Sequence, residues 1–167
     1  MEVVPALEAT SRSEPCEKQV FEGLAVSGKT IAVAESCTGG LIAHRLTNVP
    51  GISACFLGGI VAYSNEAKVG FLGVDRADLA AHGAVSAPVA RHMAEGVRER
   101  FGADIGAAVT GIAGPGGATP GKPVGVVYVA VSSGAGTTVS RHEFSGPREA
   151  VKAQSADEAL KMVLECL

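Results

Sequence analysis

The sequence predicts an α/β protein, organised as a single three-layer α/β/α domain with a mixed β-sheet. Short apolar runs of strand length alternate along the chain with segments whose apolar residues recur at helical spacing. The 167 residues suit one domain with one core. Because 47% of the residues are hydrophobic but only 4% are aromatic, this core must consist mainly of small aliphatic side chains, which suit a sheet covered by closely packed helices.

The first half of the chain begins with a segment that lacks periodicity. Residues 1–12 are therefore expected to form a flexible tail, and residues 13–167 the folded domain. Ser13 can cap a first helix, since the apolar residues that follow recur on one face. The other elements expected in this half are a strand at 30–34, a helix that ends at about 48, a strand at 55–63 and a helix that ends at about 72.

The second half continues the alternation. Ser86 opens a longer helix, whose apolar residues keep helical spacing as far as Phe101. The remaining expected elements are strands at 104–110, 124–131 and 137–144, the last at an edge of the sheet, and a helix from Arg148 to the end. The 13 residues from Gly111 to Pro123 separate two strong strands. So long an irregular connection in a compact domain is usually functional or disordered.

Composition and spacing argue against several classes of function. The net charge of −3 and the lack of a basic cluster argue against direct nucleic acid binding. The four cysteines and four histidines lack the spacing of a disulfide framework or a metal site, so we expect no metal and no cofactor. No apolar run reaches the roughly 20 residues of a membrane span, and no secretion signal is evident. We therefore expect a cytoplasmic protein with reduced cysteines and no membrane partner.

The motif AESCTGG follows the first predicted strand and places Ser36 where two glycines open a helix. A nucleophile at such a point is exposed, and nearby backbone N–H groups, from Cys37 to Gly40, can stabilise an oxyanion. The alternative is that Ser36 or Thr38 only caps the helix. Cys37 is a rival nucleophile, but no neighbouring feature supplies a histidine partner.

The motif YSNEAK follows the second predicted strand and places Lys68 in the first turn of a helix. The helix dipole and burial would both lower the pKa of Lys68, and a lysine base requires this because its ordinary pKa is about 10.4. Tyr63, at the strand end, can hydrogen-bond to the serine or the lysine, or relay a proton. The alternative is an ordinary surface lysine on a short helix.

The motif TGIAGPGGATPGKP occupies the long connection after a buried strand. Exposed backbone amides in a glycine-rich loop suit an anionic ligand such as a phosphate. Part of the motif has the spacing of a Walker A sequence, but Pro123 stands where a magnesium-binding Ser or Thr is required, and a strand follows instead of a helix. The alternative to a binding loop is a mobile surface loop.

Taken together, AESCTGG, GGIVAYSNEAK, GAVS at 83–86 and VTGIAGPGGATPGKPVGVVYVA resemble the CinA C-terminal family, which includes stand-alone nicotinamide-nucleotide amidases. The resemblance implies hydrolysis of nicotinamide mononucleotide to nicotinic acid mononucleotide and ammonia without a metal. It also implies that Ser36 is the nucleophile, assisted by Lys68 and Tyr63. The substrate-binding residues expected from these motifs are Cys37, Thr38, Gly39, Gly40, Asn65, Thr110, Gly111, Gly114, Gly116, Gly117 and Arg148.

One departure from the family pattern lies near the carboxyl terminus. The family motif is similar to F-x-G-D-R, but here Pro147 replaces the aspartate before Arg148. Two other interpretations therefore stay open: a nucleotide-binding or regulatory module that has lost catalysis, and an amidase for another small amide. A homo-oligomer is also possible, in which the GISACF segment at 51–56 and the last helix form either a subunit contact or part of the core.

Overall fold

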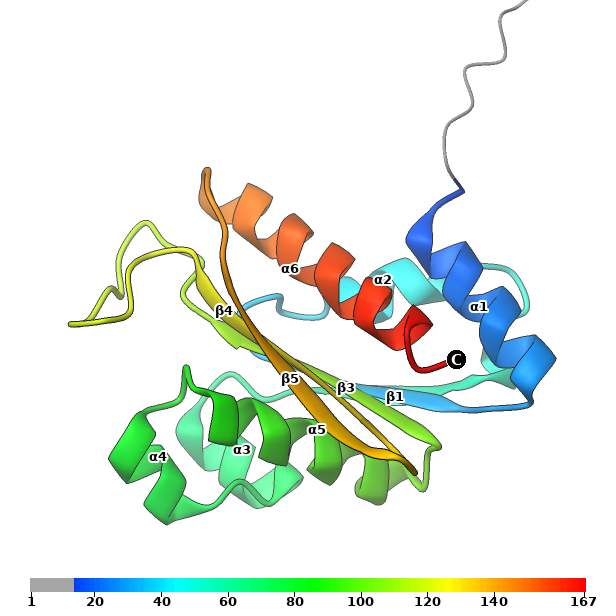
Figure 1. The fold of residues 1–167 in the computed structure, drawn as a ribbon, viewed down its shortest axis with the longest axis horizontal. Coiled ribbons are helices and arrows are strands. Elements are labelled where there is room, and N and C mark those ends of the chain that lie inside the picture. The colour runs from blue at the N-terminus through cyan, green and yellow to red at the C-terminus, as the bar shows by residue number, and fades with distance from the viewer. Residues whose placement is uncertain (1–13) are drawn as a thin grey trace, which may run out of the picture.

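The computed structural model describes residues 14–167, which form a five-stranded mixed sheet with helices on both faces (Figure 1). This confirms the predicted single α/β domain with a mixed sheet. The predicted tail at 1–12, and Ser13, lie outside the described residues. The elements are α1 (Cys16–Ser27), β1 (Ile31–Glu35), α2 (Leu41–Thr47), the 3-10 turn η1 (Ile52–Ala54), β2 (Phe56–Val61), α3 (Asn65–Leu72), α4 (Arg76–His82), α5 (Ala87–Phe101), β3 (Ile105–Gly111), β4 (Val126–Ser133), β5 (Gly136–Glu143) and α6 (Arg148–Leu164).

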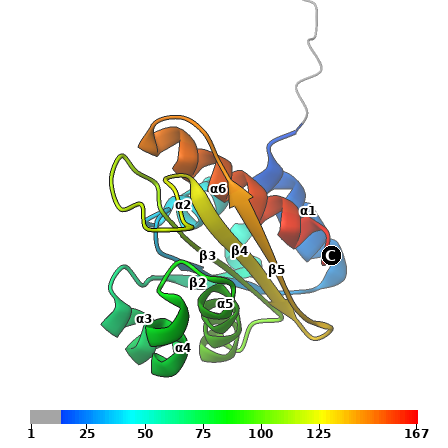
Figure 2. The same ribbon diagram turned by 60° about the vertical axis from the view of Figure 1, so that its left-hand side comes forward.

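The strand order is β2-β1-β3-β4-β5, with β1 parallel to both of its neighbours. β4 pairs with β3, and β5 pairs with β4, both in antiparallel orientation. Helices α1, α2 and α6 cover one face of the sheet, and α3, α4 and α5 lie on the other (Figures 1 and 2). Because β1, β2 and β3 run in the same direction, their carboxyl ends meet at one edge of the sheet, the usual location of ligand sites in open α/β sheets.

The core has two layers, one on each face of the sheet. Along β1, Ile31 and Val33 pack in the layer with α1, α2 and α6, whereas Ala32 and Ala34 pack in the layer with α5. All four side chains are fully buried. This alternation is the period-two pattern of a strand covered on both faces, and the small side chains on the second face let α5 lie close to the sheet.

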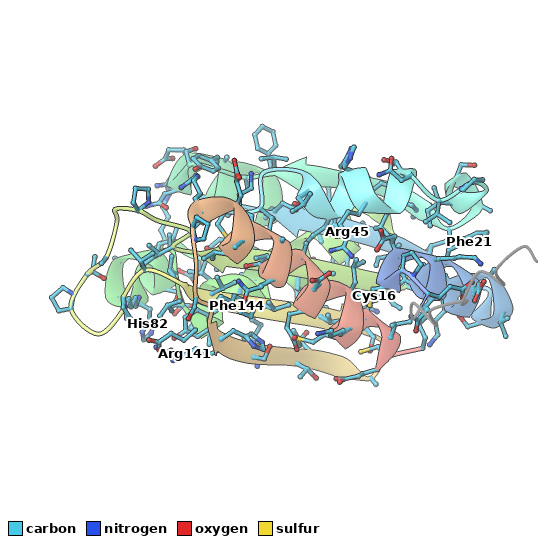
Figure 3. The ribbon with its side chains drawn as sticks, turned by 90° about the horizontal axis from the view of Figure 1, so that it is seen from above. Cys16, Phe21, Arg45, His82, Arg141 and Phe144 are labelled. Atoms are coloured by element: carbon cyan, nitrogen blue, oxygen red, sulfur yellow. The ribbon has the colours of Figure 1, made fainter. Side chains whose placement is uncertain are left out.

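Polar contacts hold the first helical layer together. Arg45 on α2 donates hydrogen bonds to Glu17 on α1 (2.7 Å) and to Asp157 on α6 (2.6 Å), and it lies between these helices in Figure 3. In the GISACF segment at 51–56, which was expected to form either a subunit contact or part of the core, Ile52 and Cys55 are buried in the core of the same layer. These two side chains are therefore core residues of the chain.

Three predicted elements needed correction. Helix α1 begins at Cys16 with Pro15 at its amino-terminal cap position, which is later than the predicted start. Strand β4 begins at Val126 because Gly125 adopts a positive φ of 94° in a turn before it. Helix α4 was missed, although Asp75 caps it by accepting a hydrogen bond from the N–H of Ala77 (2.6 Å).

Candidate active site

The site begins in the turn that joins β1 to α2. This turn is tight because Gly39 and Gly40 adopt positive φ values of 62° and 98°, which strongly favour glycine. The N–H of Ser36 donates to the carbonyl of Val109 on β3 (3.0 Å), which anchors the serine to the neighbouring strand. Ser36 thus lies directly beyond the carboxyl edge of the parallel strands, as its motif predicted.

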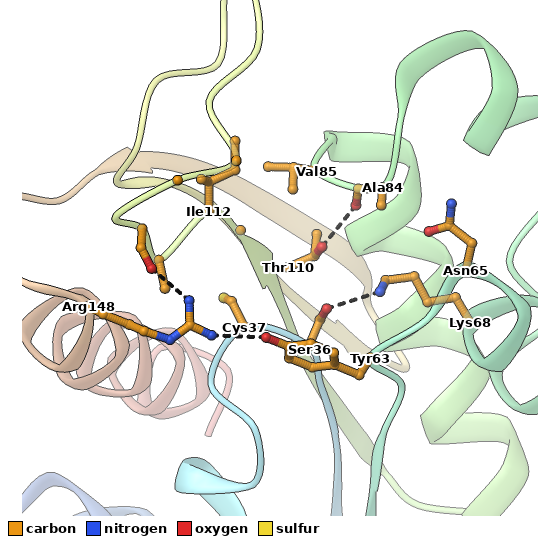
Figure 4. A pocket seen from close by; sticks show the side chains of 15 residues that line it. Ser36, Cys37, Tyr63, Asn65, Lys68, Ala84, Val85, Thr110, Ile112 and Arg148 are labelled. Carbon is orange, nitrogen blue, oxygen red and sulfur yellow. Dashed lines mark hydrogen bonds between the residues drawn. The ribbon is translucent and has the colours of Figure 1, made fainter.

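Lys68 reaches this serine from the opposite face of the sheet. Ser64 caps α3 by accepting a hydrogen bond from the N–H of Ala67 (3.1 Å), and Lys68 follows in the first turn. Its Nζ donates to Ser36 Oγ (3.0 Å) and to the carbonyl of Ala62 (2.9 Å), as Figure 4 shows for the serine. Lys68 is only 1% exposed, and no salt bridge to it is found within residues 14–167. Burial therefore lowers the pKa of Lys68.

A cavity of about 280 Å³ opens above this pair. Most of the predicted site residues line it: Ser36, Cys37, Tyr63, Asn65, Lys68, Thr110, Gly111, Gly114, Gly116, Gly117 and Arg148. Within the described part of the chain, the lining includes two basic side chains and no carboxylate. The cavity is therefore suited electrostatically to an anionic or electron-rich ligand.

Arg148 and Tyr63 meet at one side of the cavity. The Arg148 guanidinium donates to the carbonyl of Gly114 (2.7 Å) and to the hydroxyl of Tyr63 (2.9 Å), so it connects α6 to the glycine-rich loop and to the end of β2 (Figure 4). Pro147, the departure from the family pattern, occupies the amino-terminal cap position of α6 directly before Arg148. The replacement of the aspartate thus leaves Arg148 facing the cavity.

The expected role of Tyr63 needs a correction. A hydrogen bond from Tyr63 to the serine or the lysine was considered, but in the structure its hydroxyl accepts a hydrogen bond from Arg148 instead. No hydrogen bond from Tyr63 to Ser36 or Lys68 is found in the described part of the chain. The side chain is 62% exposed, because it leaves β2 toward solvent at the rim of the cavity. Sequence reasoning could not detect this pairing, since Tyr63 and Arg148 are 85 residues apart.

The turn residues after Cys37 also differ from expectation. Thr38, Gly39 and Gly40 do not line the cavity. Thr38 is fully buried, and the N–H of Gly39 closes the turn onto the carbonyl of Ser36 (3.1 Å). The N–H of Gly40 donates to the carboxylate of Glu35 (3.0 Å), so it cannot serve as an oxyanion donor in this conformation.

Cys37 lines the cavity beside Ser36 but is poorly suited to be the nucleophile. It is 5% exposed, and burial raises the pKa of its thiol to about 11. A thiol with such a pKa is protonated at neutral pH, whereas the thiolate is the reactive form. No histidine lines the cavity. The serine therefore remains the better candidate.

Four lining residues were missed by sequence reasoning: Ala84, Val85, Ile112 and Ala113. Thr110 at the end of β3 donates its hydroxyl to the carbonyl of Ala84 (2.8 Å), which brings the segment before α5 to the rim. The signal for this segment was present in the GAVS motif, but apolar side chains give no local indication of a binding role. Ile112 and Ala113 belong to the glycine-rich loop, where only the glycines had been singled out.

Lys122 confirms that the glycine-rich loop is not a P-loop. Its ammonium group donates to the carbonyl of His82, away from the cavity, and β4 rather than a helix follows. Within residues 14–167 there is no cluster of three or more His, Cys, Asp or Glu side chains that could hold a metal ion. In the same part of the chain, no helix is both long enough and apolar enough to cross a membrane.

Fold and site together define a class of protein: a three-layer α/β/α domain with a hydrogen-bonded serine–lysine pair at the carboxyl ends of its parallel strands. The chain belongs to the CinA C-terminal domain family, whose model matches residues 13–167.

Related proteins support the assignment to the CinA C-terminal domain family. The chain is 56% identical over 144 residues to a protein of Moorella thermoacetica named as competence-damage inducible, covering 86% of this chain and 35% of the relative. It is 51% identical over 154 residues to a CinA-like protein of Acidobacterium capsulatum, covering 92% and 37%. The solved structure of the competence/damage inducible protein CihA from Agrobacterium tumefaciens matches with a TM-score of 0.87 at 35% identity, covering 99% of this chain and 98% of that chain. The chain thus spans little more than a third of these two curated relatives.

Proposed function

We propose that this chain is an amidohydrolase that converts nicotinamide mononucleotide to nicotinic acid mononucleotide and ammonia. The observation that carries the proposal is the 3.0 Å hydrogen bond between Lys68 Nζ and Ser36 Oγ, made by a lysine that is only 1% exposed. A nucleophile within hydrogen-bond reach of a base is the signature of covalent catalysis. The lowered pKa of Lys68 favours the neutral amine that can accept the serine proton.

In the first proposed step, Ser36 Oγ attacks the carbon of the substrate carboxamide while its proton passes to Lys68 Nζ. The oxyanion forms next to the turn, where the N–H groups of Cys37 and Thr38 donate to no main-chain or carboxylate acceptor in residues 14–167. We assign the N–H of Cys37, which lines the cavity, as an oxyanion donor. The C–N bond then breaks, and Lys68 returns its proton to the departing nitrogen, which leaves as ammonia.

In the second step, water attacks the acyl-serine ester. Lys68 accepts a proton from the water, the C–O bond to Ser36 breaks, and the lysine returns the proton to Ser36 Oγ. The carbonyl of Ala62 holds the lysine in place through both steps, because it accepts a hydrogen bond from the same Nζ (2.9 Å). A positioned base of this kind contributes about 10²–10⁴-fold to the rate.

The choice of a nucleotide substrate is supported by the charge and size of the cavity. Among the described residues its lining contains the Arg148 guanidinium and no carboxylate, which favours a ligand with a phosphate. We assign Arg148 and the backbone of the loop at 111–117 to the ribose phosphate. The volume of about 280 Å³ lies just below the roughly 300–1,000 Å³ of small-molecule pockets, which favours a small ligand.

The test is ammonia release from nicotinamide mononucleotide by the purified chain, with and without a chelator. Ser36→Ala is compared with Ser86→Ala, which removes a hydroxyl that donates to the carbonyl of Gly83 (2.8 Å) and lies outside the cavity lining. We expect release that resists the chelator, is lost in Ser36→Ala and is kept in Ser86→Ala.

Other outcomes would select the alternatives. Undiminished activity of Ser36→Ala would reject the serine mechanism. Tight binding of the mononucleotide by the folded chain without ammonia release would favour a binding module. Ammonia release only from another small amide would keep the chemistry and change the substrate.

A further inference from the structure

Glu35, the last residue of β1, is a buried carboxylate that the proposed reaction does not use. It is 1% exposed and directly precedes Ser36. Its carboxylate accepts three hydrogen bonds, from the N–H groups of Gly40 (3.0 Å), Ile42 (3.1 Å) and Ala43 (2.8 Å) at the start of α2. No salt bridge to Glu35 is found among residues 14–167. The positive end of the α2 dipole therefore balances its charge.

This arrangement differs from an ordinary helix cap. A capping side chain comes from the residue at the helix boundary, which here is Gly40. Glu35 instead reaches across the whole turn that contains Ser36, so it joins the residue before the nucleophile to the helix after it. The main chain of Glu35 is itself fixed, because its carbonyl accepts a hydrogen bond from the N–H of Ala62 on the β2 side (2.9 Å).

Two consequences follow for the site. The turn cannot open without breaking three hydrogen bonds to a charged acceptor, each worth more than a neutral one. The carboxylate also occupies the N–H groups at the start of α2, so the donor of this turn that is left at the cavity is the N–H of Cys37.

We propose that Glu35 is a positioning residue, whose carboxylate holds the turn at 36–40 in the conformation that directs Ser36 Oγ at Lys68 and leaves the N–H of Cys37 free at the cavity. The inference rests on the proposed function only in treating Ser36 as a nucleophile. It requires no particular substrate.

The test compares Glu35→Gln with Asp104→Asn. The glutamine keeps the size of the side chain, but its NH₂ group must face at least one helix N–H. Asp104 is a matched control at the opposite edge of the sheet, where its carboxylate accepts hydrogen bonds from the N–H (2.8 Å) and the hydroxyl (2.9 Å) of Thr30. Both variants replace a carboxylate that accepts a backbone hydrogen bond with an amide, but only Glu35 borders the nucleophile.

Two readouts separate this inference from the identity of the substrate. The first is kcat and KM for ammonia release from nicotinamide mononucleotide. The second is the rate at which phenylmethylsulfonyl fluoride sulfonylates Ser36, forming an O–S bond and releasing fluoride, measured by mass spectrometry. If the wild-type chain releases no ammonia, the proposed function fails, but the labelling rates still test Glu35.

For Glu35→Gln, we expect the labelling rate and kcat to fall by about 10²-fold, as for a misplacement of roughly 1 Å, while KM changes by less than about threefold. Asp104→Asn should keep both rates at the wild-type level. Wild-type rates in folded Glu35→Gln, or equal losses in both variants, would overturn the proposal. If Glu35→Gln does not fold, amide hydrogen exchange of the wild-type chain decides: the proposal requires protection of the Gly40, Ile42 and Ala43 amides, and exchange of all three as fast as an exposed loop amide would overturn it.

Discussion

The contact between α5 and α3 provides a sharp test of how packing supports the site, because α3 carries Lys68. Gly96 on α5 lies against the last turn of α3. A methyl group added there would lie 1.8 Å from the carbonyl oxygen of Leu72 and 2.7 Å from its carbon. Since such contacts essentially never fall below 3.0 Å, the substitution Gly96→Ala requires the two helices to separate by about 1.2 Å.

A displacement of this size matters for both stability and activity. Overpacking costs about 1–3 kcal/mol, and the clash with rigid backbone places this case at the upper end. The better helix propensity of alanine returns about 1 kcal/mol. We therefore expect a net loss of about 2 kcal/mol and a fall in Tm of about 4–8 °C. If the shift lies along the 3.0 Å bond from Lys68 to Ser36, that distance grows to roughly 4.2 Å and the hydrogen bond is lost.

Gly70→Ala is the matched control. Gly70 lies within α3, is exposed, and would place its methyl group in open space. This variant should gain about 0.5–1 kcal/mol and keep wild-type activity. Both variants are measured by urea and thermal unfolding and by ammonia release. Equal stabilisation by the two alanines would refute the packing argument, and full activity in a destabilised Gly96→Ala would refute its link to Lys68.

Three further predictions concern individual side chains of the cavity. Lys68→Met should abolish ammonia release. Because burial lowers the pKa of Lys68, the unfolded chain binds the lysine proton more tightly, so wild type should gain stability relative to this variant as the pH rises from neutral toward about 10.4. Urea unfolding at several pH values checks the sign, and a relative loss with rising pH would contradict it. Tyr63→Phe should raise KM while kcat falls less than about tenfold, because the Tyr63 hydroxyl accepts a hydrogen bond from Arg148 and does not contact the Ser36–Lys68 pair. A fall in kcat of about 10²-fold or more would instead support a proton relay through Tyr63. Iodoacetamide should label Cys16 and Cys166, which are half-buried, before it labels Cys37, whose thiol has a pKa of about 11. Peptide mapping that finds Cys37 labelled first would contradict the burial of the Cys37 thiol.

Much of the fold and part of the site were predictable because their signals are local. The continuous apolar run of β1, buried throughout, and the helical spacing of apolar residues in α5 both appear directly in the sequence. The positions of Ser36 and Lys68 also followed from local pattern, since each lies just after a predicted strand, and parallel strands bring their carboxyl ends together. Helix α4 was missed, although Asp75 before it was a local signal for its amino-terminal cap.

The hydrogen-bond partners of the site were decided by tertiary structure alone. Arg148 pairs with Tyr63 across 85 residues, and Lys68 pairs with Ser36 across 32 residues. A donor in the sequence has many possible acceptors, and only the packed sheet and helices select one of them. The same holds for burial, which keeps charged groups from water and so sets their pKa values. The sequence by itself therefore determined which chemical groups this protein carries to one edge of its sheet, and the tertiary structure determined which of them are paired, buried or left free to meet a ligand.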